Sequence, residues 1–146
     1  MASVFDVAAY ILAKKGEMSA VKLQKLVYYS QAWSLVWDDA PLFDQRIEAW
    51  VHGPVVPDLY NYSRNRFSVA QEHMPPNANP DALTPRQKAT VDAVLNFYGD
   101  KDSQWLSDLS HMEAPWKNAR VGLGPADRSN RPISLKSMAE YYSSLR

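Results

Sequence analysis

The apolar positions at the start of the chain follow the spacing of an α-helix. A first helix is predicted to begin after Ser3, a suitable N-cap residue with Asp6 three positions later, and to end at Gly16. The residues on its apolar side are Val4, Phe5, Ala8, Ile11 and Leu12. This stretch therefore predicts an amphipathic helix.

The next predicted helix is longer and is apolar on nearly all sides. It covers residues 20–37, with Ser19 as its N-cap and with no Pro or Gly inside it. A helix of this kind is usually buried, so we expect it to be the central helix of the domain. Gln24 and Gln31 lie seven residues apart and therefore on one side of it. If they are buried, each amide needs hydrogen-bond partners, because an unsatisfied one costs about 1–3 kcal/mol.

The stretch over residues 38–57 changes to turn residues and short apolar runs. Every second residue from Ile47 to Val51 is apolar and aliphatic or small, which is compatible with a short strand or hairpin. A small β element is therefore expected near residues 42–52. Pro54 and Pro57 exclude a continuous helix here, and Pro57 fits the first turn of a new helix that runs to about Arg64.

Proline and polar residues mark the ends of the predicted elements in the second half of the chain. Residues 70–83 hold three prolines and no periodic pattern, so they predict a surface loop. Thr84, Pro85 and Gln87 then provide an N-cap, a proline in the first turn and a capping box for a helix that ends at Gly99.

Two further helices are predicted toward the C-terminus. One begins near Asp102 or Ser103 and is stopped or kinked at Pro115, with a short helical turn after it over residues 116–119. The other follows Ser134, after a loop over residues 122–132. About six helices result, most of them joined by short connections. We therefore expect an all-α fold, a mostly helical single domain over residues 1–146, with at most a small β element.

Composition places the chain among soluble globular domains. Of its 146 residues 46% are hydrophobic, and 16 Lys and Arg balance 16 Asp and Glu. Zero Cys excludes disulfides, thiolate chemistry and Cys-based metal centres. No apolar run is long enough to span a bilayer, and no charged segment precedes the first apolar stretch as in a signal peptide, so we expect a cytoplasmic protein without a membrane partner.

Charge is nevertheless uneven along the chain. Residues 116–136 hold five cationic residues and one acidic residue, whereas residues 37–59 hold five acidic residues and one cationic residue. Such asymmetry is typical of solvated surface or of two faces that attract each other. Because the net charge is zero and no reading motif accompanies the basic stretch, we do not expect nucleic acid as a partner.

The catalytic motifs that the sequence offers are incomplete. His111 and Glu113 form an H-x-E pattern like that of zinc-dependent deaminases, but the cysteines of that signature are missing. His52 is the nearest further candidate for a metal-dependent hydrolase site with them, without a known ligand spacing. The sequence therefore favours a protein that is not an enzyme and has no cofactor or metal, and the hydrolase hypothesis stays as an alternative.

Three stretches resemble one known family. The first is KLQKLVYYSQAW over residues 22–33, the second is PLF followed by RIEAWVHGPVVP over residues 41–57, and the third is LSHMEAPW over residues 109–116. They are similar to the motifs of the Panacea, or SocA-like antitoxin, domain, which also occurs in phage-associated GepA-type proteins. The matching motif residues are Leu23, Gln24, Lys25, Leu26, Tyr28, Tyr29, Gln31, Trp50, Gly53, Pro54, Val55, Pro57, His111, Glu113, Pro115 and Trp116.

This resemblance implies a mostly helical domain without enzyme activity that neutralises a cognate protein toxin by direct contact. In one branch of the family the antitoxin also delivers its toxin to a ClpXP-type protease. The chain departs from the motifs at Val51 and Ser110, and neither change affects the expected fold. A stand-alone, phage-associated interaction protein is the alternative within the same resemblance.

The residues alone suggest where a partner would bind. The motif residues read mainly as a folding signature, so specificity is expected at more exposed positions. Aromatic side chains near proline-rich turns and the basic stretch are the candidates for this surface. They are Trp50, His52, Tyr60, Tyr62, Arg120, Arg128 and Arg131.

Overall fold

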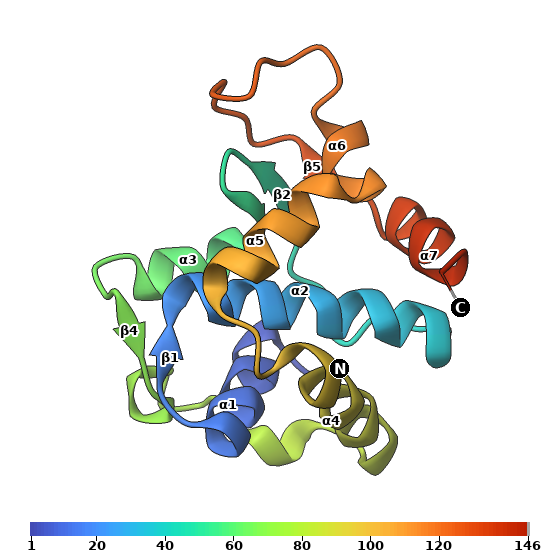
Figure 1. Ribbon diagram of the computed structural model, residues 1–146. Helices are drawn as coiled ribbons and strands as arrows, with labels where there is room; N and C mark the ends of the chain where they lie inside the picture. The colour runs from blue at the N-terminus through green and yellow to red at the C-terminus, as the bar shows by residue number, and fades with distance from the viewer. Residues whose placement is uncertain (146) are drawn as a thin grey trace.

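Helix α2 (Ala20–Trp37) runs through the centre of the protein, whose computed structural model describes residues 1–145 (Figure 1). Four helices pack against it: α1 (Val4–Lys15), α4 (Pro85–Tyr98), α5 (Ser103–Met112) and α7 (Leu135–Ser143). The short helices are α3 (Pro57–Ser63) and α6 (Ala114–Ala119). Residues 23–34 of α2 are all buried, which confirms the prediction of a buried central helix.

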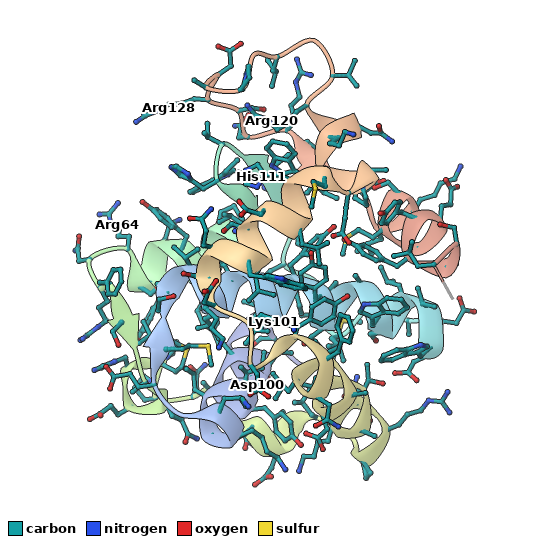
Figure 2. All side chains as sticks on the ribbon, in the orientation of Figure 1. Arg64, Asp100, Lys101, His111, Arg120 and Arg128 are labelled. Carbon is teal, nitrogen blue, oxygen red and sulfur yellow. The ribbon has the colours of Figure 1, made fainter. Side chains whose placement is uncertain are left out.

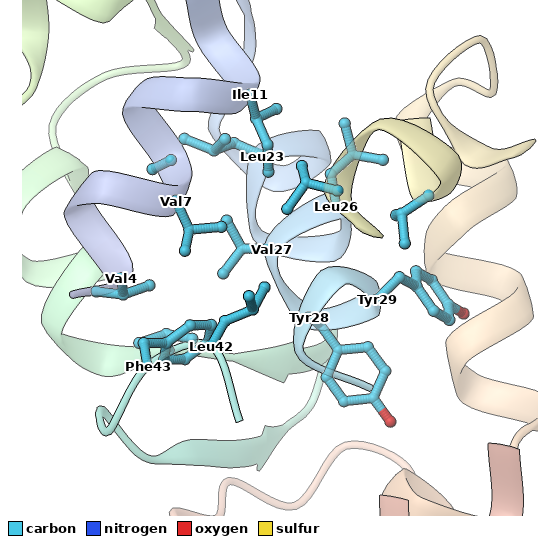
Figure 3. Close-up of a cluster of buried hydrophobic side chains, with 14 of the residues drawn as sticks. Val4, Val7, Ile11, Leu23, Leu26, Val27, Tyr28, Tyr29, Leu42 and Phe43 are labelled. Carbon is cyan, nitrogen blue, oxygen red and sulfur yellow. The ribbon is translucent and has the colours of Figure 1, made fainter. Parts of the chain in front are cut away.

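Aliphatic side chains fill the core between α1 and α2, whereas Tyr28 and Tyr29 lie on the side of α2 away from α1 (Figure 3). Val4, Val7 and Ile11 of α1 face the side chains of α2 in Figure 3. The chain after α2 closes this core with Leu42 and Phe43, neither of which is exposed. The segment that precedes the β-hairpin is therefore anchored on the central helix.

The β structure is more extensive than the hairpin expected near residues 42–52. Strands β2 (Ile47–Trp50) and β3 (Gly53–Val55) form that hairpin, with Ala49 opposite Pro54. Strand β5 (Pro132–Ile133) adds to the other edge of β2, and β1 (Met18–Ser19) pairs with β4 (Ser68–Val69). The fold is mostly helical but not purely all-α. Sequence periodicity missed three strands because each has only two residues and pairs with a distant segment.

Local signals located most helices correctly. The capping boxes of Ser3 with Asp6 and of Thr84 with Gln87 are both present. The predicted turn over residues 116–119 is a complete helix, α6, so residues 1–145 contain seven α-helices instead of about six. The predicted loop over residues 70–83 contains two 3-10 helices, η1 (Gln71–His73) and η2 (Pro80–Ala82). None of the helices in the described chain has both the length and the apolar character needed to cross a bilayer.

One long connection projects from this framework. Between α6 and β5 the chain makes a loop over residues 120–131 that rises beyond the β2–β3 hairpin at the top of Figure 1. Because β5 pairs with β2, the end of this loop returns to the hairpin. The loop and the hairpin turn are therefore neighbours in space although about 70 residues of sequence separate them.

Candidate functional site

Gly53 brings the turn of the β2–β3 hairpin against the central helix. Its φ is +120°, and a Cβ atom at this position would lie 2.9 Å from Cε of Lys25 and 3.1 Å from Oγ of Ser110. The buried ammonium of Lys25 donates a hydrogen bond of 3.3 Å to the carbonyl oxygen of Pro54. Burial lowers the pKa of Lys25 to about 8, because it penalises the charged form. The close packing of hairpin on helix therefore depends on glycine.

Side chains of α5 and α6 contact the backbone of the same turn. His111 places Nε2 2.8 Å from the carbonyl oxygen of Val51 and Nδ1 against the carbonyl oxygen of Ser107. The indole N–H of Trp116 donates a 2.7 Å hydrogen bond to the carbonyl oxygen of Trp50. The rings of His111 and Trp116 contact each other, with centroids 4.3 Å apart. Both side chains are thus occupied with fixing the hairpin backbone.

Arg120 fastens the long loop to the hairpin. Its guanidinium donates hydrogen bonds to the carbonyl oxygens of Ala49 (3.0 Å), Gly124 (3.2 Å) and Asp127 (2.7 Å), and it lies over the ring of Trp116. Only 5% of Arg120 is exposed. The sequence placed Arg120 on the partner surface, but this side chain is inside the protein, where it shapes the loop.

These contacts leave an open groove of about 910 Å³ between the hairpin turn, α3 and the loop. One wall belongs to the hairpin and α3, and the other to the loop, from which Arg128 extends in Figure 2. The groove is lined by Trp50, Val51, His52, Tyr60, Ala126, Arg128, Ser129 and Asn130. Its volume lies near the upper end of the range of about 300–1,000 Å³ for small-molecule pockets.

The aromatic floor of the groove is Trp50 with Tyr60. Their rings meet edge to face, with centroids 4.8 Å apart and an interplanar angle of 69°. The indole N–H of Trp50 donates a 2.8 Å hydrogen bond to Oε1 of Glu48, whose other carboxylate oxygen pairs with Arg46. Glu48 is buried, like Ile47 and Ala49 on either side of it. Trp50 therefore offers its ring, and not its N–H, to a ligand.

Four of the seven predicted partner-binding residues line this groove: Trp50, His52, Tyr60 and Arg128. Tyr62 lies elsewhere and packs on Phe5, with ring centroids 5.6 Å apart. Arg131 is exposed outside the lining and donates a hydrogen bond to the carbonyl oxygen of Val121.

The sequence did not predict part of the groove lining, nor which residues the charged stretches pair with. Ala126, Ser129 and Asn130 carry no motif, and only the course of the loop brings them to the groove. Within residues 1–145 no ion pair joins the basic stretch to the acidic one. Asp38 pairs instead with Arg86 of α4, and Glu48 pairs with Arg46 of the same acidic stretch.

The two glutamines of α2 clamp the chain segments on either side of the hairpin. Gln31 donates to the carbonyl oxygen of Phe43 (2.9 Å) and accepts from the backbone N–H of Leu42 (2.7 Å). Gln24 makes the same pair of bonds with the backbone of Val56, at 3.2 and 2.9 Å. Both side chains are buried, and both have the hydrogen-bond partners that the sequence argument required.

Glu113 joins the end of α5 to the central helix and to α7. Its Oε1 accepts hydrogen bonds from the hydroxyls of Tyr29 (2.7 Å) and Tyr142 (2.8 Å), and the hydroxyl of Tyr28 lies 3.0 Å from that of Tyr142. Burial raises the pKa of Glu113 above its ordinary value of 4.5, and the two phenol hydrogen bonds oppose that shift.

The remaining motif residues are apolar or proline positions in the same framework. Pro57 and Pro115 each lie in the first turn of a short helix, α3 and α6. The others pack in or beside the core: Leu23, Leu26, Tyr28 and Val55.

The residues of the hydrolase hypothesis are not gathered into a metal-binding cluster. Over residues 1–145 there is no group of three or more His, Asp or Glu side chains that could hold a metal ion. Glu113 is buried among tyrosines, His111 contacts backbone carbonyl oxygens, and His52 is exposed on the groove.

Comparison with known proteins agrees with the motif resemblance. No curated protein and no solved structure matches the chain. The sequence model of one family, the antitoxin SocA-like, Panacea domain, matches residues 23–117. This match contains the hairpin, α3 and the aromatic floor of the groove, whereas the loop wall follows it in sequence. Because the match covers more than half of the chain, the protein belongs to the family of SocA-like antitoxins with a Panacea domain.

Proposed function

We propose that the protein neutralises a cognate protein toxin by direct binding and that the groove is part of the contact surface. The observation that carries the proposal is a groove of aromatic and cationic side chains on a domain of an antitoxin family. Trp, Tyr and Arg are the residues that most often dominate the free energy of protein–protein binding. Trp50, Tyr60 and Arg128 are all present in the lining.

The hydrogen bonds of the side chains support the groove as the contact surface. Motif residues such as Gln31, His111 and Glu113 use their polar atoms for internal contacts. By contrast, no hydrogen bond or ion pair within residues 1–145 uses the side chain of His52 or Arg128. Side chains that do not hold the fold together are available to a partner, and exposed aromatic surface marks interaction sites.

The test is co-expression with the product of the neighbouring gene. We expect that product to stop growth when it is expressed alone, and we expect the protein to restore growth and to co-purify with it in a stoichiometric complex. Failure to rescue growth, with both proteins present in the cells, would refute the proposal. Repeating the rescue in a host without ClpXP separates neutralisation by binding, which persists there, from neutralisation by delivery to the protease.

A further inference from the structure

We infer that the groove binds an acidic segment of the partner protein, in which a carboxylate lies next to an apolar side chain. This inference rests on the proposed function, because it names the chemistry of the surface that the toxin would present. It follows from the hydrogen-bonding groups of the lining, from the position of the nearby carboxylates and from the aromatic floor.

The lining is rich in hydrogen-bond donors and contains no carboxylate. Arg128 has five N–H donors and no acceptor, and the Asn130 amide adds two more donors. Ser129, His52 and the hydroxyl of Tyr60 are the other polar groups of the lining. A surface of this composition is complementary to a ligand with acceptor oxygens and negative charge.

Asp127 and Glu48, which lie close in sequence to the loop wall and to the aromatic floor, are already engaged, and neither forms an ion pair with Arg128. Asp127, the residue before it, accepts a 2.7 Å hydrogen bond from the backbone N–H of Gly124 with Oδ2. Glu48, behind the floor, is buried against Trp50 and Arg46. None of the ion pairs within residues 1–145 includes Arg128. The positive charge at the groove therefore remains available to a ligand.

The aromatic floor adds an apolar requirement beside this charge. The N–H of Trp50 is occupied by Glu48, so the accessible parts of Trp50 and of its neighbour Tyr60 are ring surface. Ring surface is best covered by an aliphatic or aromatic side chain. A ligand that satisfies both walls thus carries a carboxylate for the loop and an apolar side chain for the hairpin and α3.

Single-stranded nucleic acid would also combine negative charge with flat rings, but the groove suits it less. Tight binding of nucleic acid uses several cations along a track, and its affinity comes mainly from phosphate contacts. Among residues 1–145, Arg128 is the one Lys or Arg side chain in the lining, and the net charge of the chain is zero. One guanidinium beside an apolar floor fits a carboxylate of a folded or extended protein segment better.

Charge reversal at Arg128 tests the inference, with Arg64 as the matched control. Arg64 is an exposed arginine at the end of α3, outside the groove lining, and forms no ion pair within residues 1–145. Figure 2 shows it beside α3 and not on the loop that carries Arg128. We would measure the affinity of the neighbouring gene's product for the wild-type protein, Arg128→Glu, Arg128→Gln and Arg64→Glu. Calorimetry at two salt concentrations, with thermal unfolding of each variant, separates binding from folding.

The expected result is a loss of affinity of about tenfold or more for Arg128→Glu, a smaller loss for Arg128→Gln and a change of less than about twofold for Arg64→Glu. Wild-type affinity should also fall with added salt, and more steeply than that of Arg128→Gln. A Glu→Lys or Asp→Lys substitution in the partner should restore binding to Arg128→Glu.

Two results would overturn the inference. One is wild-type affinity in the folded Arg128→Glu variant, and the other is displacement of the partner by a dT oligonucleotide of about 20 nucleotides, which would assign the groove to nucleic acid. Both leave neutralisation of a toxin by direct binding standing if growth is still rescued. If the wild-type protein neither binds the partner nor rescues growth, the proposed function and the inference fall together.

Discussion

The hydroxyl of Tyr29 donates a 2.7 Å hydrogen bond to Oε1 of Glu113, so that a residue in the middle of the central helix is tied to the junction of α5 and α6. These two residues belong to different sequence motifs and lie 84 positions apart. Tyr142 of the last helix shares the same carboxylate oxygen. One buried carboxylate thus links three helices, and it does so in a site where ionisation is disfavoured.

Glu113→Gln should flatten the dependence of stability on pH. The pKa of Glu113 is raised in the folded state, so ionisation of this group disfavours folding, and its unfavourable contribution grows as pH rises from about 4.5 through the folded pKa. Glutamine keeps an acceptor oxygen for the tyrosines without the charge. We therefore expect wild type to lose stability relative to Glu113→Gln as pH rises, measured by urea unfolding from pH 4.5 to pH 8. Parallel curves for the two proteins would contradict the assignment.

Lys25→Met should be at least as stable as wild type at pH 7. The pKa of Lys25 falls from 10.5 to about 8, which corresponds to about 3 kcal/mol of stability lost by keeping the ammonium charged inside the protein. Removing the donor leaves the carbonyl oxygen of Pro54 unpaired, which offsets part of the gain. Because the unfolded chain stays protonated up to about pH 10.5, wild type should regain stability relative to Lys25→Met between pH 8 and 10.5. A constant difference across that interval would show that Lys25 is not buried as described.

Gly53→Ala should destabilise the protein more than Gly16→Ala does. Both glycines have positive φ, +120° and +82°, so both substitutions strain the backbone. Only at position 53 would the new Cβ also approach other atoms closely, those of Lys25 and Ser110. We expect about 1 kcal/mol of destabilisation at Gly16 and about 2–4 kcal/mol at Gly53, measured by thermal unfolding. Equal losses would mean that the hairpin can move away from α2.

Gln31→Ala should cost several times more stability than Gln104→Ala. The side chain of Gln31 bonds the backbone of Leu42 and Phe43 in the interior, and its loss leaves buried polar groups without partners, at about 1–3 kcal/mol each. Gln104 makes one exposed bond to Asp108 on α5, so its truncation should change stability by less than about 0.5 kcal/mol. Chemical denaturation of both variants measures the difference. If Gln31→Ala matched Gln104→Ala, water would be replacing the lost amide.

Tyr60→Ala should weaken binding of the partner, whereas Tyr62→Ala should not. These two tyrosines of α3 are similarly exposed, at 40% and 48%, but Tyr60 lines the groove and Tyr62 packs on Phe5. An aromatic anchor at an interface typically contributes about 2 kcal/mol or more, so we expect the affinity to fall more than about tenfold for Tyr60→Ala alone. Titration calorimetry with the neighbouring gene's product measures it. Equal losses for the two variants would move the contact surface away from the groove.

The groove illustrates why only part of the site was predictable. Trp50 and Tyr60 were accessible to sequence reasoning, because aromatic residues beside proline-rich turns are candidates for an interface. Tyr62 fulfils the same criterion but faces Phe5, since two positions along a helix turn a side chain by about 200°. Arginine is a residue type that is usually exposed, but Arg120 is buried and donates hydrogen bonds to carbonyl oxygens of the hairpin and the loop. Such outcomes depend on where distant segments meet.

The local features could be predicted from the sequence alone: the buried central helix, the helix caps at Ser3 and Thr84, a small β element near residues 42–52, the need of Gln24 and Gln31 for partners, and the antitoxin family. Each of these depends on residues close together in the chain or on a motif of fixed spacing. Other features became visible only in the tertiary structure. They are the two-residue strands, the burial of Glu48 and Arg120, and the position of Arg128 in the same groove as Trp50 and Tyr60. These features depend on contacts between segments far apart in the chain, such as β2 with β5, about 80 or more residues apart, and the hairpin with the loop wall, and contacts of this kind leave no periodic trace in the sequence.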